Sequence, residues 1–158
     1  MKKIIGIDPG LAATGIGIVS GKGVKIESFA FGSINTCAND SMQNRLGHIF
    51  GQILSVLKNE KPDLMVIEDV FFMPKYPKSG ITLGKVSGVV LLAGSQLDVP
   101  AEEVTVREVK QVLTGNGSAS KVQLEMAVRH LLNMKTPIRP YHASDAMALA
   151  LIGLYRLI

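Results

Sequence analysis

The stretch Lys2–Gly10 constrains the fold of this chain more than any other segment, because an apolar run ends there in a carboxylate. Its three isoleucines supply apolar side chains to both faces of an extended segment, which is typical of a strand in the middle of a sheet. Asp8 ends the predicted strand, and the Pro-Gly pair after it forces a turn. Taken alone, Asp8 is equally well explained as a turn aspartate that bonds its own backbone.

Composition predicts one compact domain that spans residues 1–158, because 47% of the residues are hydrophobic and the mean hydropathy is +0.28. A net charge of +4 favours an anionic partner without naming one. The single cysteine, Cys37, excludes an internal disulfide and fits a reducing cytoplasm. No apolar run is long enough to span a bilayer, so we expect a soluble cytoplasmic protein that makes no use of a membrane.

The hydrophobic pattern predicts an α/β fold in which a mixed five-stranded sheet is flanked by helices. Short connections make the first three strands an antiparallel meander, and a helix then leads to a fourth strand parallel to the first. The predicted strands are residues 2–8, 14–19, 24–32, 64–68 and 103–106. The predicted helices run from about residue 40 to 59 and over 81–97, 107–114, 121–132 and 146–155.

A second carboxylate, Glu68, ends the fourth predicted strand just as Asp8 ends the first. Side chains alternate along a strand, so Asp8 shares a face with residues 4 and 6, and Glu68 with residues 64 and 66. If the two strands are parallel neighbours, both carboxylates stand at the sheet edge where ligands bind in open α/β sheets. By the same alternation Asp69 points to the opposite face, so we leave it out of the site.

His142 and Asp145 lie three residues apart at the first turn of the last, apolar helix, so their side chains face the same way. Each has an ordinary alternative, a loop histidine bonded to backbone and a carboxylate favoured by the helix dipole. With Asp8 and Glu68 they make three carboxylates and one imidazole. Because converging carboxylates repel one another, we expect a divalent metal: Mg²⁺ or Mn²⁺, with the imidazole leaning towards Mn²⁺.

Basic and aromatic residues cluster in two other places. The segment 70–80 combines Phe71, Phe72, Lys75 and Lys78 with no acid, which suits stacking on unpaired bases with the lysines on phosphates. The alternative is that the phenylalanines are core residues. Farther along, residues 107–121 carry Arg107 and Lys110 on one helix and a glycine-rich loop before Lys121, where a phosphate could bind. Simple helix capping by Ser120 and Gln123 explains that loop equally well.

Four motifs in this chain, taken in order, resemble those of RuvC-type Holliday junction resolvases. They are Ile4–Gly10 with Thr14-Gly, Val66–Phe71, Val109-Lys-Gln with Gly117–Lys121, and Ala143–Ala146. The resemblance runs from about residue 2 to 156 and implies a ribonuclease H-like fold. It also implies a homodimer that binds four-way DNA junctions and nicks two symmetry-related strands in DNA recombination and repair, leaving 5′-phosphate and 3′-hydroxyl ends.

The resemblance also assigns residues. It implies metal and catalytic roles for Asp8, Glu68, His142 and Asp145, junction contact for Phe71, and phosphate binding for Lys110 and Lys121. To the DNA-binding set we add Phe72, Lys75, Lys78 and Arg107. His142 stands where many members of the family have aspartate, which bears on metal preference and pH dependence.

The resemblance and the residues together suggest hydrolysis by two Mg²⁺ ions per subunit, for which Mn²⁺ could substitute. Asp8 would bridge the two ions, and Glu68 and Asp145 would complete their shells, while His142 would bind an ion or orient the attacking water. The family further suggests a mild preference for thymine-rich sites and a branch-migration motor as partner.

Three other classes of protein remain as alternatives. Another ribonuclease H-like nuclease, such as one that processes ribosomal RNA precursors, would share the carboxylates but not the junction dimer. An actin-like or sugar-kinase-like ATPase also carries Asp-x-Gly after its first strand, but that fold needs two lobes and 158 residues supply one. A binding module without catalysis would not need four convergent metal-type ligands.

Overall fold

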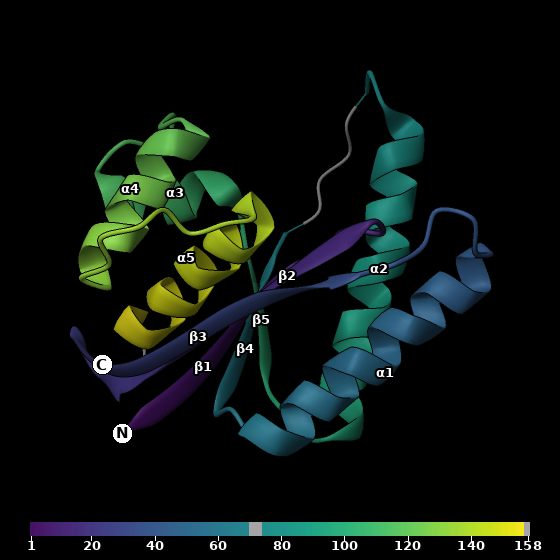
Figure 1. The fold of residues 1–158 in the computed structure, drawn as a ribbon, viewed down its shortest axis with the longest axis horizontal. Helices are drawn as coiled ribbons and strands as arrows, with labels where there is room; N and C mark the ends of the chain where they lie inside the picture. Colours follow the sequence, from purple (N-terminus) through teal and green to yellow (C-terminus); the bar gives the residue numbers. More distant parts are fainter. Residues whose placement is uncertain (70–73, 157–158) are drawn as a thin grey trace.

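The computed structural model describes residues 1–69 and 74–156, and its centre is a mixed sheet with helices on both faces (Figure 1). The strands are β1 (Lys2–Asp8), β2 (Ala13–Lys22), β3 (Lys25–Asn35), β4 (Leu64–Glu68) and β5 (Ala101–Val104). The helices are α1 (Met42–Glu60), α2 (Pro77–Gln96), α3 (Val106–Thr114), α4 (Lys121–Leu131) and α5 (Tyr141–Arg156). No helix in these two ranges is long and apolar enough to cross a membrane.

The sheet order is β3-β2-β1-β4-β5, which puts β1 in the centre. The pairs β1–β2 and β2–β3 are antiparallel, whereas β4 is parallel to both β1 and β5. The predicted fold class is therefore confirmed: three antiparallel strands are followed by parallel ones. Because β1 and β4 are parallel neighbours, Asp8 and Glu68 stand at the same edge of the sheet.

Each face of the sheet has its own hydrophobic core. On one face, Ile5, Ile7 and Met65 pack against α1 and α2. On the other face, Ile4 and Val66 pack beneath α5, with α3 and α4 completing the layer. Figure 1 shows the two layers on opposite sides of the sheet, with α5 in yellow lying directly on it.

Helix α5 lies unusually close to the sheet because three residues beneath it are glycines. A Cβ atom at Gly6 would come within 2.0 Å of the Ala146 carbonyl oxygen. One at Gly15 would come within 1.9 Å of the His142 carbonyl oxygen, and one at Gly17 within 2.5 Å of the Met147 nitrogen. The backbone of α5 therefore packs directly against the backbone of β1 and β2, and this contact fixes the position of the first turn of α5.

Several predicted boundaries were wrong. Helix α5 begins at Tyr141 rather than at residue 146, so His142 and Asp145 lie within its first turns. Two more were wrong because residues at the start of a helix were read as loop or strand. Helix α2 begins at Pro77 rather than at residue 81, since proline occupies its first turn, where its missing N–H costs nothing. Strand β5 spans Ala101–Val104 rather than 103–106. The next residue, Thr105, is the N-cap of α3, and its hydroxyl accepts a hydrogen bond of 3.2 Å from the Glu108 backbone nitrogen.

The hairpin between β2 and β3 is longer and tighter than the sequence predicted. Strand β2 continues to Lys22 through an irregularity at Ser20 and Gly21, and only Gly23 and Val24 form the turn. Gly23 adopts a φ of 59°, which glycine tolerates without strain. Strand β3 then runs on to Asn35, so the meander extends farther towards the end of the sheet that carries Asp8.

Candidate active site

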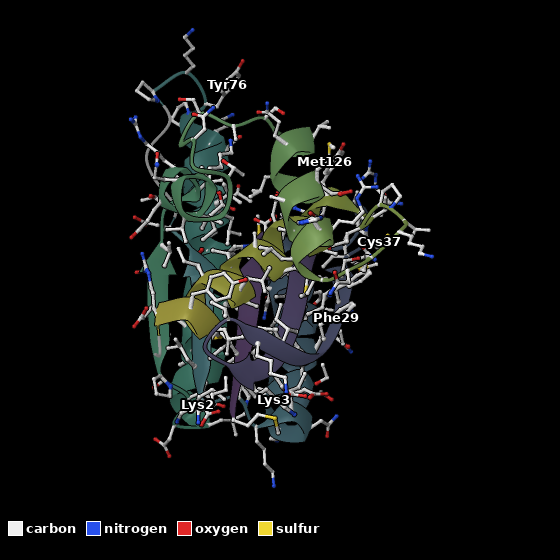
Figure 2. All side chains as sticks on the ribbon, turned by 90° about the vertical axis from the view of Figure 1, so that its left-hand side faces the viewer. Lys2, Lys3, Phe29, Cys37, Tyr76 and Met126 are labelled. Carbon is white, nitrogen blue, oxygen red and sulfur yellow. The ribbon has the colours of Figure 1, made fainter. Side chains whose placement is uncertain are left out.

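A cavity of about 320 Å³ opens at the edge of the sheet where β1 and β4 end. Its walls come from both of these strands, from the first turns of α4 and α5, and from α2 and α3. The lining residues are Asp8, Pro9, Glu68, Asp69, Leu83, Val106, Lys110, Lys121, Leu124, His142 and Asp145. Figure 2 shows the length of the molecule, with Lys2 and Lys3 at the end far from this edge and Tyr76 at the opposite end.

Asp8 is the central acid of the cavity. Its side chain is 8% exposed, and its Oδ2 atom lies 2.7 Å from Nδ1 of His142. This hydrogen bond raises the pKa of His142 above its ordinary value, because the protonated ring is held by the carboxylate, and burial opposes the shift only in part. The first strand and the last helix are thus joined by a direct polar contact.

The negative charge of Asp8 contributes to the raised pKa values of both Glu68 and Asp145. Burial, followed by the neighbouring Asp8 carboxylate, raises the pKa of Glu68 to about 9. Burial and the charge of Asp8 also raise the pKa of Asp145. The Lys121 ammonium lies 3.8 Å from Asp145 Oδ2 and opposes both shifts. The lysine therefore offsets only part of the burial and of the Asp8 charge that raise both pKa values.

Two threonines hold the turn that follows Asp8. The Thr14 side chain is fully buried, and its hydroxyl donates to the Gly10 carbonyl oxygen (2.7 Å) and accepts from the Gly10 nitrogen (3.3 Å). From the other side, the Thr36 hydroxyl donates to the Leu11 carbonyl oxygen at 2.5 Å. These bonds satisfy half-buried backbone groups of the turn that follows Asp8 and so fix the end of β1 from which the Asp8 carboxylate reaches the cavity.

The cationic wall comes from α3 and α4. Lys110 is half-buried on α3, and Lys121 is the first residue of α4. The predicted capping box is confirmed: the Ser120 hydroxyl accepts from the Gln123 nitrogen (3.1 Å), and the Gln123 side chain accepts from the Ser120 nitrogen (2.8 Å). The cap fixes the start of α4 and therefore the base of Lys121.

The donor set of this cavity fits a hard divalent cation. Carboxylate oxygens are the ligands such ions prefer, and a cation would oppose the burial and the Asp8 charge that raise the pKa of Glu68. Within residues 1–69 and 74–156, no three acidic, histidine or cysteine side chains are close enough together to form a preassembled metal site.

A protein-family model described as crossover junction endodeoxyribonuclease RuvC matches residues 4–153. The chain belongs to the RuvC family. Among curated RuvC proteins it is 40% identical to that of Carboxydothermus hydrogenoformans over 155 residues, which cover 98% of this chain and 97% of the relative. It is 43% identical to that of Thermosipho melanesiensis over 148 residues, which cover 94% of each chain.

Among solved structures, the fold matches that of T. thermophilus RuvC in complex with a Holliday junction substrate. The TM-score is 0.92 at 31% sequence identity, and the match covers 99% of this chain and 95% of the other. The predicted resemblance to RuvC-type resolvases is thereby confirmed, together with the ribonuclease H-like fold. The ATPase alternative is excluded by the same match.

Six of the residues predicted from the sequence meet in the cavity of this RuvC-family chain: Asp8, Glu68, Lys110, Lys121, His142 and Asp145. Three other predicted DNA-binding residues are exposed and are not among the described residues that line it. Lys75 lies in the turn just before α2, Lys78 lies in the first turn of α2, and Arg107 lies on α3. The predicted aromatic residues Phe71 and Phe72 lie outside the described residues.

Asp69 lines the cavity, so our exclusion of it was wrong. The exclusion assumed strand alternation, but β4 ends at Glu68 and alternation does not extend beyond the strand. The Asp69 nitrogen instead donates to the Val104 carbonyl oxygen (2.9 Å), which ties the chain to the end of β5. The role of Thr14 in holding the turn was not predicted, although the Thr14-Gly pair belongs to the first of the four motifs.

Proposed function

We propose that this cavity is the active site of a structure-selective endonuclease that resolves four-way DNA junctions by paired symmetric nicks. One observation carries the proposal: Asp8, Glu68, Asp145 and His142 share a cavity with two lysines, in a chain that belongs to the RuvC family throughout residues 4–153. The carboxylates suit metal-assisted hydrolysis and the lysines suit a phosphate. Residues 1–158 act as one nuclease domain in this proposal.

Asp8, Glu68, Asp145 and His142 are the proposed metal and catalytic residues. When bound, two Mg²⁺ ions, or Mn²⁺ in their place, supply an activated water and stabilise charge on the leaving oxygen. Asp8 has the central position, since it contacts His142 and raises the pKa of both other acids. His142 is held by its Nδ1 atom and can accept or release a proton during attack on the phosphorus. The P–O3′ bond breaks, which leaves a 3′-hydroxyl and a 5′-phosphate.

The cations around the cavity form the proposed DNA-binding surface. Lys110 and Lys121 reach the scissile phosphate, and Lys75, Lys78 and Arg107 contact the neighbouring backbone. Phe71 and Phe72 are proposed to stack on unpaired bases at the branch point, since aromatic stacking is tolerant of sequence. This arrangement favours DNA that is opened at a branch over a continuous duplex.

A homodimer is the proposed working unit, because two symmetric nicks require two cavities. Helix α2 supports a dimer surface: Ile81, Gly84, Gly88 and Leu92 recur at helical spacing and are exposed. Both glycines have open space where a Cβ would stand, so another backbone can approach closely. A branch-migration motor is a further proposed partner. Light scattering on the purified chain tests the dimer.

The test of the function is Mg²⁺-dependent nicking of a synthetic four-way junction, compared with linear duplex DNA, an RNA–DNA hybrid and ATP. We expect paired nicks in the junction, with ends that a ligase can join. Preferred cutting of the hybrid or of structured RNA would instead indicate another ribonuclease H-like nuclease. Turnover of ATP without nicking would overturn the proposal.

A further inference from the structure

Glu125 on α4 is a buried charge that the proposed chemistry does not use. Its side chain is 3% exposed, and its Oε2 atom has no hydrogen-bond partner among the residues that the structure describes. Its Oε1 atom lies 3.2 Å from the Arg129 guanidinium, one helical turn away, and 3.9 Å from that of Arg139. A carboxylate is costly to bury, so this position calls for a reason beyond stability.

The contact with Arg139 links Glu125 to the start of α5. Arg139 stands two residues before Tyr141, and its guanidinium lies 4.2 Å from the centre of the Tyr141 ring. The same guanidinium donates to the Ile138 carbonyl oxygen at 3.0 Å. Because Tyr141 is the first residue of α5 and His142 is the second, Arg139 holds the backbone immediately before the active-site residues.

Helix α4 faces this region with two opposite charges one turn apart. Lys121 points towards Asp145 inside the cavity, whereas Glu125 points towards Arg139 just outside it. Residues four apart lie on the same face of a helix, so α4 contacts the beginning of α5 through Lys121 and the segment just before α5 through Glu125. Figure 1 shows the connection from α4 running past α5 before that helix begins.

We propose that Glu125 is a positioning residue: through Arg139 it fixes the first turn of α5, and thereby sets His142 and Asp145 opposite Asp8. This inference rests on the proposed function, because it concerns the geometry of the same cavity. The proposed chemistry depends on how the side chains of this cavity are held, and displacement by about 1 Å can reduce a rate a hundredfold. The Glu125 carboxylate would act by attracting the Arg139 guanidinium to one position. An apolar residue in its place would fill the same space without holding Arg139.

The test compares three variants of the full chain: Glu125→Met, Arg139→Ala and Arg129→Ala. Arg129→Ala is the matched control, because it also removes one guanidinium from Glu125 but leaves the link to α5 intact. Three quantities are measured for each: the melting temperature, the affinity for Mn²⁺ by calorimetry without DNA, and the rate of junction nicking at saturating junction and Mg²⁺.

We expect Glu125→Met and Arg139→Ala to lower the nicking rate tenfold to a hundredfold and to weaken Mn²⁺ binding several-fold. Arg129→Ala should lower the melting temperature yet keep both the rate and the affinity within about twofold of the parent. If Glu125→Met does not fold, Arg139→Ala carries the test, because that side chain is half-exposed.

Two results would overturn the inference: parental rate and affinity in Arg139→Ala, or equal losses in Arg129→Ala and Arg139→Ala. The second result would mean that Glu125 serves stability alone. An inactive parent that binds Mn²⁺ would reject the proposed function without rejecting this inference, because the metal affinities of the variants still measure how the ligands are held.

Discussion

The two faces of the sheet differ in the size of the side chains that pack against their helices. The face beneath α1 and α2 is filled by large side chains such as Ile5, Ile7 and Ile53, all fully buried. The face beneath α5 has glycines at positions 6, 15 and 17 in place of large side chains, and the helix backbone packs against the strands at these positions. The first face supplies burial of apolar area, and the second supplies an accurate distance between β1 and α5.

The difference explains why the polar site lies where it does. Close packing of α5 brings His142 to within 2.7 Å of Asp8. On the other face, the polar contact between β1 and α1 lies at the start of β1, where the Lys3 ammonium donates to Glu60 at 3.0 Å, far from the cavity. Changes on the α5 face should therefore disturb the proposed chemistry directly. Changes on the other face should alter stability and leave the chemistry of folded molecules alone.

The largest expected effect is the loss of cleavage in Asp8→Asn and Asp145→Asn. Each amide keeps the shape of the side chain but loses the charge that holds a cation, so the nicking rate should fall by about a thousandfold or more, or about 4 kcal/mol. Junction binding should stay the same or become tighter, because less negative charge faces the phosphates. Ile53→Val on the other face is the control and should cost only about 1 kcal/mol of stability. If gel shifts show that binding disappears together with cleavage, the two acids support the fold instead.

The next effect concerns the glycines. Gly6→Ala places a Cβ within 2.0 Å of the Ala146 carbonyl oxygen, so α5 must move or the chain must lose about 3 kcal/mol or more of stability. Gly51→Ala, in an exposed position of α1 with open space around it, should be neutral or stabilise by up to about 1 kcal/mol. Thermal melts of both variants measure the contrast, and similar melting temperatures would refute the close-packing argument.

A smaller effect is the pH dependence of stability in the metal-free protein. The folded chain holds a proton on Glu68 up to a pKa of about 9, whereas the unfolded chain releases it near the ordinary 4.5. Between these values the folded state binds more protons, so stability should fall as pH rises, by at most about 1.4 kcal/mol per pH unit. His142 acts in the same direction, because its raised pKa gives stability that is complete below 6.5 and is lost as pH rises through the folded value.

Urea denaturation in the presence of a chelator, at several pH values, measures this slope. Glu68→Gln should flatten it, because the amide does not titrate, and added Mg²⁺ should also flatten it by compensating the charge. A parent protein whose stability does not change between pH 5 and about pH 9 would contradict the assignment of the buried proton.

The smallest effect is on the salt dependence of junction binding. Lys110→Ala and Lys121→Ala should each weaken binding to all branched DNA alike and reduce the slope of log affinity against log salt by about one unit. Lys58→Ala is the control, since that residue lies in the last turn of α1, away from the cavity, and should leave the slope unchanged. Equal slopes in all three variants would identify Lys110 and Lys121 as ordinary solvated surface.

Much of the site could be read from the sequence because it follows from strand geometry. Alternation along β1 and β4, together with one crossover helix, was enough to place Asp8 and Glu68 at the same edge. Helical spacing did the same for His142 and Asp145 at the start of α5. Such arguments need only the local period of each element and the parallel pairing of two strands.

The remaining features of the site depend on packing between elements, which the hydrophobic periodicity of the sequence does not reveal. The positions of Gly15 and Gly17 matter only because α5 lies above them. Glu125 follows Lys121 by one turn and reads as a solvated charge, yet the segment before α5 covers it. Local signals could have corrected two boundaries, since Pro77 suits a first helical turn and the spacing of Thr105 and Glu108 is that of a capping box.

The contact between Asp8 and His142 spans 134 residues of sequence, nearly the whole chain. During synthesis β1 leaves the ribosome first, and the first turn of α5 follows only after every other strand and helix has emerged. A nascent chain thus carries Asp8 for most of its synthesis, and Glu68 for almost half of it, without the helix that completes the cavity. In the proposed function, competence to cut DNA therefore arises only when the last helix packs onto the sheet, so we expect the chain to be inactive while it is still being made.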